Sequence, residues 1–98
     1  MIVHPETERA SAIITASGIL DTGGAKTISA MTLDGGTAAT GATAVLNNST
    51  DGSGTDKWAL RATQYGSASI SFPKPIPLTT ACYVTLTGTS SRLSIAFA

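Results

Sequence analysis

The sequence holds one histidine, His4, the only side chain that could serve as the base of a Ser-His-Asp triad. A triad works only when the histidine is held between its nucleophile and its carboxylate. His4 lies in a short N-terminal stretch with no hydrophobic pattern to fix it, and no G-x-S-x-G elbow occurs. We therefore predict a non-enzymatic protein with no catalytic residues.

A glycine-rich run, Gly23-Gly24-Ala25-Lys26-Thr27, superficially resembles a phosphate-binding loop. It lacks the G-x-x-x-x-G-K-[ST] spacing that arranges backbone N–H groups around phosphates. A hairpin turn that leads into a strand explains the same residues. We therefore expect no nucleotide cofactor.

Oxygen ligands for a hard cation such as calcium are concentrated in residues 47–56, which read NNSTDGSGTD. The spacing of Asn47, Asn48, Asp51 and Asp56 fits no EF-hand. Exposed loops have the same composition, and this stretch contains no apolar side chain. We interpret it as an exposed, mobile loop.

Zinc ligands are also few. His4, Glu6 and Glu8 could chelate zinc, but ordering a flexible segment around the metal has a large entropic cost. The one cysteine, Cys82, excludes an intrachain disulfide and a multi-cysteine zinc site. We predict neither a metal nor another cofactor.

Small side chains dominate the composition. Alanine, threonine, serine and glycine occupy 52 of 98 positions, whereas leucine, isoleucine, valine and phenylalanine occupy 20. A chain of this length forms one core, and so few large apolar residues predict marginal stability as a monomer. We assign residues 10–98 to a single β domain.

Charge argues against several partners. Six basic and six acidic residues give a formal net charge of zero, which disfavours nucleic acid and anionic lipid. No apolar stretch approaches the roughly 18 residues of a membrane span, and the N-terminus lacks the basic start of a signal peptide. We expect a soluble protein.

Alternation of apolar and polar residues is clearest near the C-terminus, where Leu93, Ile95 and Phe97 share one face. Residues 58–63, 67–72 and 82–87 alternate in the same way, with turn residues between the segments. The pattern predicts an all-β fold of about seven or eight short strands. We expect a small antiparallel β-sandwich or barrel, either jelly-roll or immunoglobulin-like.

Two earlier segments break the alternation. In residues 12–19, Ile13 and Ile14 are adjacent, and in residues 27–33, Ile28 is out of phase with Met31 and Leu33. A bulge or a change of buried face explains both. Residues 35–43 are open to two interpretations, a loop or a weak edge strand.

Two further features bear on partners. The run at 72–77, FPKPIP, is expected to cross between two strands rather than to bind a groove. Trp58 is in phase with Leu60, which predicts a core position. Tyr83 is out of phase with its apolar neighbours, which favours a surface or interface anchor.

The C-terminal half carries a resemblance to a known class of proteins. Its segments are WALRA at 58–62, SISFP at 69–73, IPL at 76–78 and YVTLTGT at 83–89, followed by the hydrophobic last strand. Over about residues 57–98 the chain resembles small virion proteins of tailed bacteriophages. The resemblance implies a capsid decoration or cement protein, often trimeric, that binds the major capsid protein or other virion proteins where capsomers meet. Such a protein is made in the host cytoplasm and located in the virion.

On this interpretation residues 1–9 form an extended N-terminal arm that lies on a neighbouring subunit. Ile2 and Val3 would supply apolar contacts, and the arm's charged residues would pair with the neighbour. The full set of predicted partner-binding residues is Ile2, Val3, His4, Glu6, Glu8, Arg9 and Tyr83.

Two alternatives stay open. The first is a tail, neck or fibre-associated phage subunit that assembles through its sheet edges. The second, of another class, is a carbohydrate-binding β-sandwich module in which Trp58 or Tyr83 stacks on a sugar.

Overall fold

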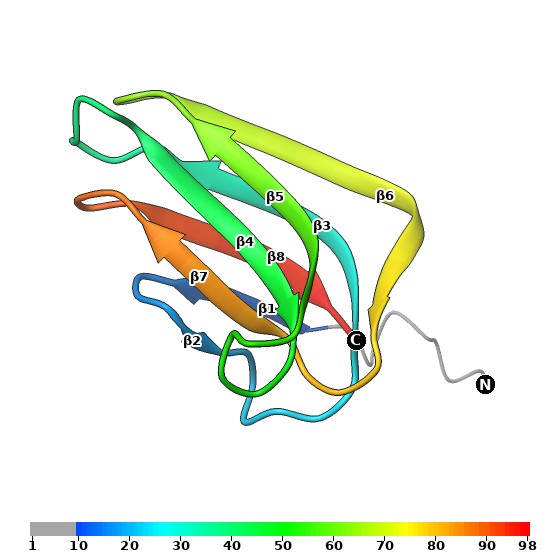
Figure 1. The fold of residues 1–98 in the computed structure, drawn as a ribbon. Helices are drawn as coiled ribbons and strands as arrows, with labels where there is room; N and C mark the ends of the chain where they lie inside the picture. Colours follow the sequence, from blue (N-terminus) through cyan, green and yellow to red (C-terminus); the bar gives the residue numbers. More distant parts are fainter. Residues whose placement is uncertain (1–9) are drawn as a thin grey trace.

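Two four-stranded antiparallel sheets make up the computed structural model, which describes residues 10–98 (Figure 1). The strands are β1 (Ala10–Ile14), β2 (Gly18–Ile19), β3 (Lys26–Asp34), β4 (Ala42–Asn48), β5 (Thr55–Ala62), β6 (Ser67–Leu78), β7 (Tyr83–Thr87) and β8 (Arg92–Phe97). The predicted all-β class and strand number are confirmed. The predicted arm, residues 1–9, lies outside the described residues.

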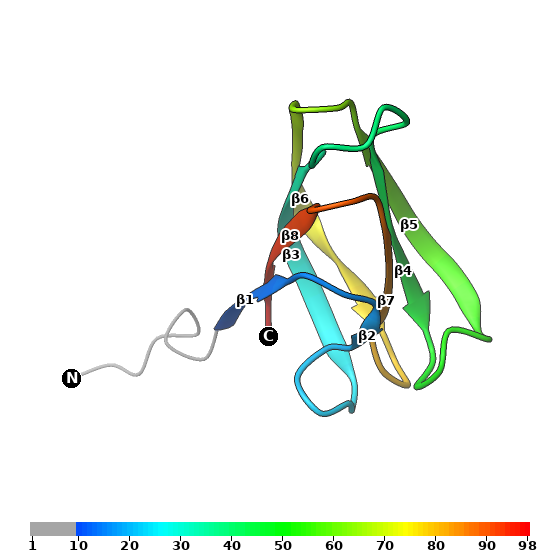
Figure 2. The ribbon, with the colours of Figure 1, turned by 90° about the vertical axis from the view of Figure 1, so that its left-hand side faces the viewer.

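The strand order defines a jelly roll. One sheet runs β1-β8-β3-β6 and the other β2-β7-β4-β5, and Figure 2 shows them as two facing layers. The first strand pairs with the last, the second with the seventh, the third with the sixth and the fourth with the fifth. This nested pairing is the double-sheet arrangement of jelly rolls.

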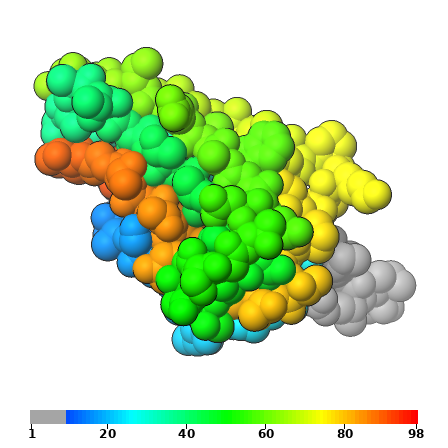
Figure 3. Space-filling model, viewed as in Figure 1, coloured from blue at the N-terminus to red at the C-terminus, as the bar shows by residue number. Residues whose placement is uncertain are grey.

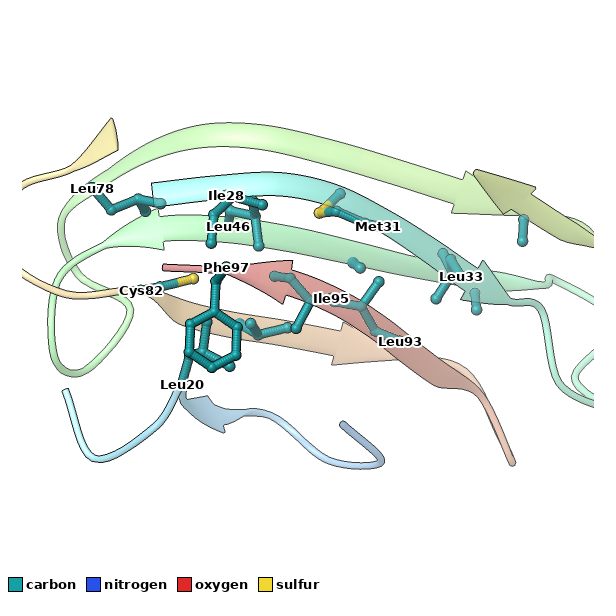
Figure 4. Packing of buried hydrophobic residues seen from close by; sticks show 14 residues of the cluster. Leu20, Ile28, Met31, Leu33, Leu46, Leu78, Cys82, Leu93, Ile95 and Phe97 are labelled. Atoms are coloured by element: carbon teal, nitrogen blue, oxygen red, sulfur yellow. The ribbon is translucent and has the colours of Figure 1, made fainter. Parts of the chain in front are cut away.

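The core lies between the sheets and draws its large side chains from both (Figure 4). The largest fully buried residues are Ile28, Met31, Leu33, Leu46, Leu78, Leu93, Ile95, Val84 and Cys82. The predicted alternation of β8 is confirmed, because its three large apolar residues are buried while Arg92 and Ser94 are exposed.

Within residues 10–98, no helix has the length and apolarity needed to span a membrane.

A bulge in β3 explains its irregular pattern and decides between the two explanations, a bulge or a change of buried face, that the sequence left open. Ile28 pairs with Phe97 and Ala30 with Ala96, so that Ser29 is an extra residue. The insertion shifts the phase by one and lets Ile28, Met31 and Leu33 all face the core. Residues 12–19 change face differently, because the chain leaves β1 after Ile14 and enters the opposite sheet as β2.

The proline-rich run does not cross between strands, and this prediction is wrong. Pro73, Pro75 and Pro77 all lie within β6, at the edge of its sheet. The register with β3 passes from Ser71 to Ile76 opposite the bulge, so residues 72–75 loop out of the ladder. Edge strands and bulges are where a sheet tolerates residues without an N–H group.

Trp58 is not a core residue either, although its face was predicted correctly. β5 ends its sheet, so its inward face is covered only in part, and Trp58 keeps 37% of its surface exposed. Its ring packs edge to face on Phe72 of β6. In Figure 3 the green surface of β5 adjoins the yellow-green surface of β6, which closes this side of the sandwich.

Loops gather at the two ends of the sandwich. Residues 35–41 form a loop and β4 begins at Ala42, so of the two interpretations of residues 35–43 the loop is the correct one for most of the segment.

The predicted hairpin at residues 23–27 is wrong, because this turn joins β2 and β3, which belong to different sheets. Gly23 and Gly24 still provide the turn, both with positive φ.

Candidate assembly surface

Of the candidate catalytic and phosphate-binding residues, Lys26 lies in the described part of the chain. His4 lies outside residues 10–98. The Lys26 ammonium donates to the Gly23 carbonyl at 2.8 Å and lies 3.9 Å from the Asp21 carboxylate, so it stabilises its own loop. The glycines and the lysine that resemble a phosphate-binding loop therefore serve to hold this turn together.

Residues 47–56, which the sequence predicted to be a loop, are not a loop throughout, because β4 ends at Asn48 and β5 begins at Thr55. Most of this segment is exposed, but Asn47 and Ser49 are buried. The Asn47 side chain is 2% exposed, and its amide donates to the Gly54 carbonyl at 2.9 Å and to Asp56 Oδ1 at 2.7 Å. Its Oδ1 accepts from the Gly54 N–H at 2.9 Å and from the Ser49 hydroxyl at 2.6 Å. All four hydrogen-bonding positions of this amide are used inside the loop, so the loop is held closed.

Asn48 and Asp51, two more of the candidate calcium ligands, bind partners away from Asn47. Asn48 Oδ1 accepts from the Thr80 N–H at 2.8 Å, in the next loop of the chain. Asp51 accepts from the side chain and backbone of Ser53, which lowers the pKa of the exposed Asp51 carboxyl. Among residues 10–98, no three His, Cys, Asp or Glu side chains gather as metal ligands would.

Cys82 is sealed in the core immediately before β7. Its carbonyl accepts from the Leu20 N–H at 2.8 Å, which joins the β2 and β7 ends of one sheet. Burial raises the pKa of the Cys82 thiol to about 11. The thiol is therefore protonated at neutral pH and has no path to a partner.

Tyr83 is half-buried in β7, where its ring lies beside Gly52 of the 47–56 loop. A Cβ atom at Gly52 would lie 3.1 Å from Tyr83 Cδ1, so the loop fits closely over the ring. Its role as a partner anchor stays a prediction, as do the roles of Ile2, Val3, His4, Glu6, Glu8 and Arg9 outside the described residues. Tyr65, in the β5–β6 loop, is far more exposed at 75%.

The four edge strands offer different opportunities for pairing with another chain. β2 has two residues, and β6 carries three prolines and a bulge. β5 is eight residues long but presents Lys57 and Arg61 to solvent. β1 reads ASAII, with neither charge nor proline, and within residues 10–98 it has a neighbour, β8, on one side only.

Ile13 is the functional candidate that the sequence pattern missed. It projects outward from β1 and is 68% exposed, whereas Ile14 packs against the core. The signal was present, because two adjacent isoleucines in a strand must point to opposite faces. One of them therefore had to be exposed.

Small side chains form most of the outer face of this sheet. Ser11, Ala96, Ala30 and Ser71 lie in one row across the four strands, and Ile13, Ser94, Thr32 and Ser69 lie in the next. Beyond them Arg92 and Asp34 form an exposed ion pair at 3.5 Å. A shallow hollow of about 180 Å³ opens over this face and is lined by Ser11, Ala30, Met31, Thr32, Ser94, Ile95 and Ala96.

Comparison with solved structures gives one likeness in fold. The chain is similar to a protein of Bacillus endospore appendages, described as a novel family of disulfide-linked pili, with a TM-score of 0.51 and 17% identity. The alignment covers 92% of this chain and 82% of the other. No protein-family model and no curated protein matches the sequence.

Proposed function

We propose that this protein is a non-enzymatic structural subunit that works by assembling with copies of itself and with other structural proteins. The observation that carries the proposal is Ile13, a large apolar side chain 68% exposed on an uncharged edge strand. Soluble monomers usually protect such an edge with charges, prolines or a cover. The fold likeness to a pilus protein supports the same class of function.

In its finer form, the proposal places the subunit on a tailed bacteriophage as a capsid decoration or cement protein. Its partner would be the major capsid protein, its location the virion, and its oligomer a trimer, as the resemblance of residues 57–98 implies. Residues 1–9 would attach it to a neighbour. The pilus likeness equally supports the fibre-associated alternative, in which the same subunit builds a tail, neck or fibre.

We expect the subunits of such an assembly to be held together without disulfide bonds. The pili of the similar protein are disulfide-linked. Here the one cysteine, Cys82, is fully buried with its thiol protonated, so it cannot link folded subunits. We expect the assembly to resist reducing agents and to run as single chains in denaturing gels without reductant.

The test is the mass of the protein in solution, by light scattering behind size exclusion, with and without residues 1–9. We expect the full chain to form an oligomer, with a mass of at least twice the 9.9 kDa of one chain. Removing the arm should weaken attachment to isolated phage particles more than it lowers the unfolding temperature. A full chain that stays monomeric at all concentrations and binds no particle would contradict the proposal.

Carbohydrate binding remains the second candidate, because Trp58 leaves part of its ring exposed at the β5 edge. A sugar-binding module should lose retention on a glycan array when Trp58 is replaced by alanine. Replacement of Tyr65, the exposed loop tyrosine, serves as the control. An assembly subunit should show no glycan binding in the first place.

A further inference from the structure

We propose that the partner of β1 is β1 of a second copy of this chain, paired antiparallel about a two-fold axis at Ala12. This inference rests on the general form of the proposed function, assembly with copies of itself, and names the contact that self-assembly uses. A two-fold pair closes as a dimer, so it departs from the trimer of the finer form. The pairing would join two β1-β8-β3-β6 sheets into one continuous sheet. Main-chain hydrogen bonds between the two strands would satisfy the edge groups that β8 leaves free.

The length of β1 selects the register. A two-fold pair centred on Ala12 brings all five residues of Ala10–Ile14 opposite a residue of the other copy. A centre at Ile13 would leave the first two residues opposite positions 15 and 16, where β1 has already ended. Among residues 10–98, the Ala12 register is therefore the one that pairs the whole of β1 with β1 of the other copy.

The side chains of β1 are self-complementary in this register. Ile13 of one copy faces Ser11 of the other, and Ile14 faces Ala10, so each large side chain meets a small one. No like charges meet, because β1 has none. Both faces of the joined sheet are thus filled without a clash or a buried charge.

The hollow on the outer face lies where this pairing needs it. Ser11 lines that hollow, and the row continues through Ala96 to Ala30. Ile13 of the second copy would stand beside Ser11 and lean over these small residues. The exposed apolar side chain and the space that receives it are on the same surface of the same chain, as a two-fold contact requires.

The longer free edge, β5, is a poor candidate for the same contact. A two-fold pair centred on Ala59 would place Lys57 of one copy directly opposite Arg61 of the other. Like charges at directly opposed positions destabilise a strand pair. The difference between β5 and β1 is what assigns self-pairing to β1.

A charge-swap experiment tests whether β1 of one copy faces β1 of another. One variant carries Ser11→Lys and Ile13→Lys, and a second carries Ser11→Glu and Ile13→Glu. Ser11 and Ile13 are exposed, so the fold should survive, which the thermal unfolding of each variant checks. Ile19→Glu, on the edge strand of the other sheet, is the matched control at another exposed isoleucine.

We expect the wild-type chain to form a dimer of twice 9.9 kDa, with the dissociation constant at least about tenfold weaker for each charged variant alone. An equimolar mixture of the two should recover the dimer, because every introduced lysine then faces an introduced glutamate. The control should dimerise like wild type.

Other results overturn the inference in distinguishable ways. Charged variants that keep the wild-type mass, or a wild-type trimer, would remove the β1 pair and leave self-assembly standing. Charged variants that dissociate but do not recover on mixing would show that the two β1 strands do not face each other. If deletion of residues 1–9 abolishes the dimer of a folded chain, a neighbour's arm covers β1 instead. A wild-type monomer at every concentration would remove self-assembly as well.

Discussion

The rings of Trp58 and Phe72 meet edge to face, with centroids 5.1 Å apart and planes at 83°. The two residues lie on β5 and β6, the edge strands of opposite sheets, which share no hydrogen-bonded ladder. This aromatic contact therefore closes a side of the sandwich that backbone bonding leaves open. It also explains why Trp58 can be half-exposed and still contribute to stability.

Replacing Trp58 with alanine should lower the free energy of unfolding by about 2–3 kcal/mol, because it removes buried ring surface and the aromatic pair. Urea denaturation of Trp58→Ala, Phe72→Leu and the double variant forms a double-mutant cycle. We expect a coupling energy of about 0.5–1.5 kcal/mol between the rings. Additive effects would mean that the two rings stabilise the fold independently.

Replacing Asn47 with alanine should lower the free energy of unfolding by about 2–3 kcal/mol, since the Gly54 N–H and the Ser49 hydroxyl lose a buried acceptor. Chemical denaturation measures the loss, and hydrogen exchange at Gly54 reports whether the loop opens. Asn48→Ala is the control, because its bonds are more exposed and should be worth less than about 1 kcal/mol. Equal effects at the two positions would contradict the central role of Asn47.

Alanine substitutions at Gly36 and Gly24 should differ in their cost, because only one of the two positions lacks space for a Cβ atom. Both have positive φ, but a Cβ at Gly36 would lie 2.1 Å from the Thr89 carbonyl oxygen, whereas at Gly24 the nearest atom is Lys26 Nζ at 3.8 Å. We expect Gly24→Ala to cost about 1 kcal/mol for the left-handed backbone alone. Gly36→Ala should cost about 3 kcal/mol or more, because the loop beside β8 must shift. Thermal unfolding of the two variants tests this difference, and equal costs would contradict it.

The sequence predicts the parts of this fold that depend on a single strand. Alternation in β8 identifies Leu93, Ile95 and Phe97 as inward because the strand lies between two others and has one covered face. The phase error at Ile28 likewise predicts a bulge or a change of buried face in β3, and the extra residue Ser29 is that bulge. These features are encoded in neighbouring residues.

The errors concern position within a sheet, which local pattern does not encode. Alternation gives the face of Trp58 but cannot show that β5 ends its sheet, where burial is incomplete. For the same reason the prolines of residues 72–77 predict a crossing between strands, although they lie in the edge strand β6. Polar composition similarly cannot show that one amide, Asn47, makes four hydrogen bonds at once. Two adjacent isoleucines must point to opposite faces of β1, but the local pattern does not show which face the core covers, so it does not single out Ile13 as exposed.

Because the Cys82 thiol is buried, we predict that the free energy of unfolding falls at alkaline pH. Burial raises the pKa of this thiol from 9.0 to about 11 in the folded protein, while the nearby Lys26 charge opposes the shift. Between these values the unfolded chain releases the proton and the folded chain keeps it, so the free energy of unfolding falls as pH rises. Below pH 9 the thiol is protonated in both states, so its contribution to stability is constant there.

Urea denaturation at intervals from pH 8 to pH 11, compared between wild type and Cys82→Ala, isolates this contribution. We expect the wild-type curve to fall more steeply above pH 9 than that of the variant, which lacks the titrating group. The same burial predicts that a thiol reagent labels the native protein only as fast as it opens. Parallel curves, together with rapid labelling of the folded chain, would mean that Cys82 is accessible and that covalent linkage of subunits through this residue must be reconsidered.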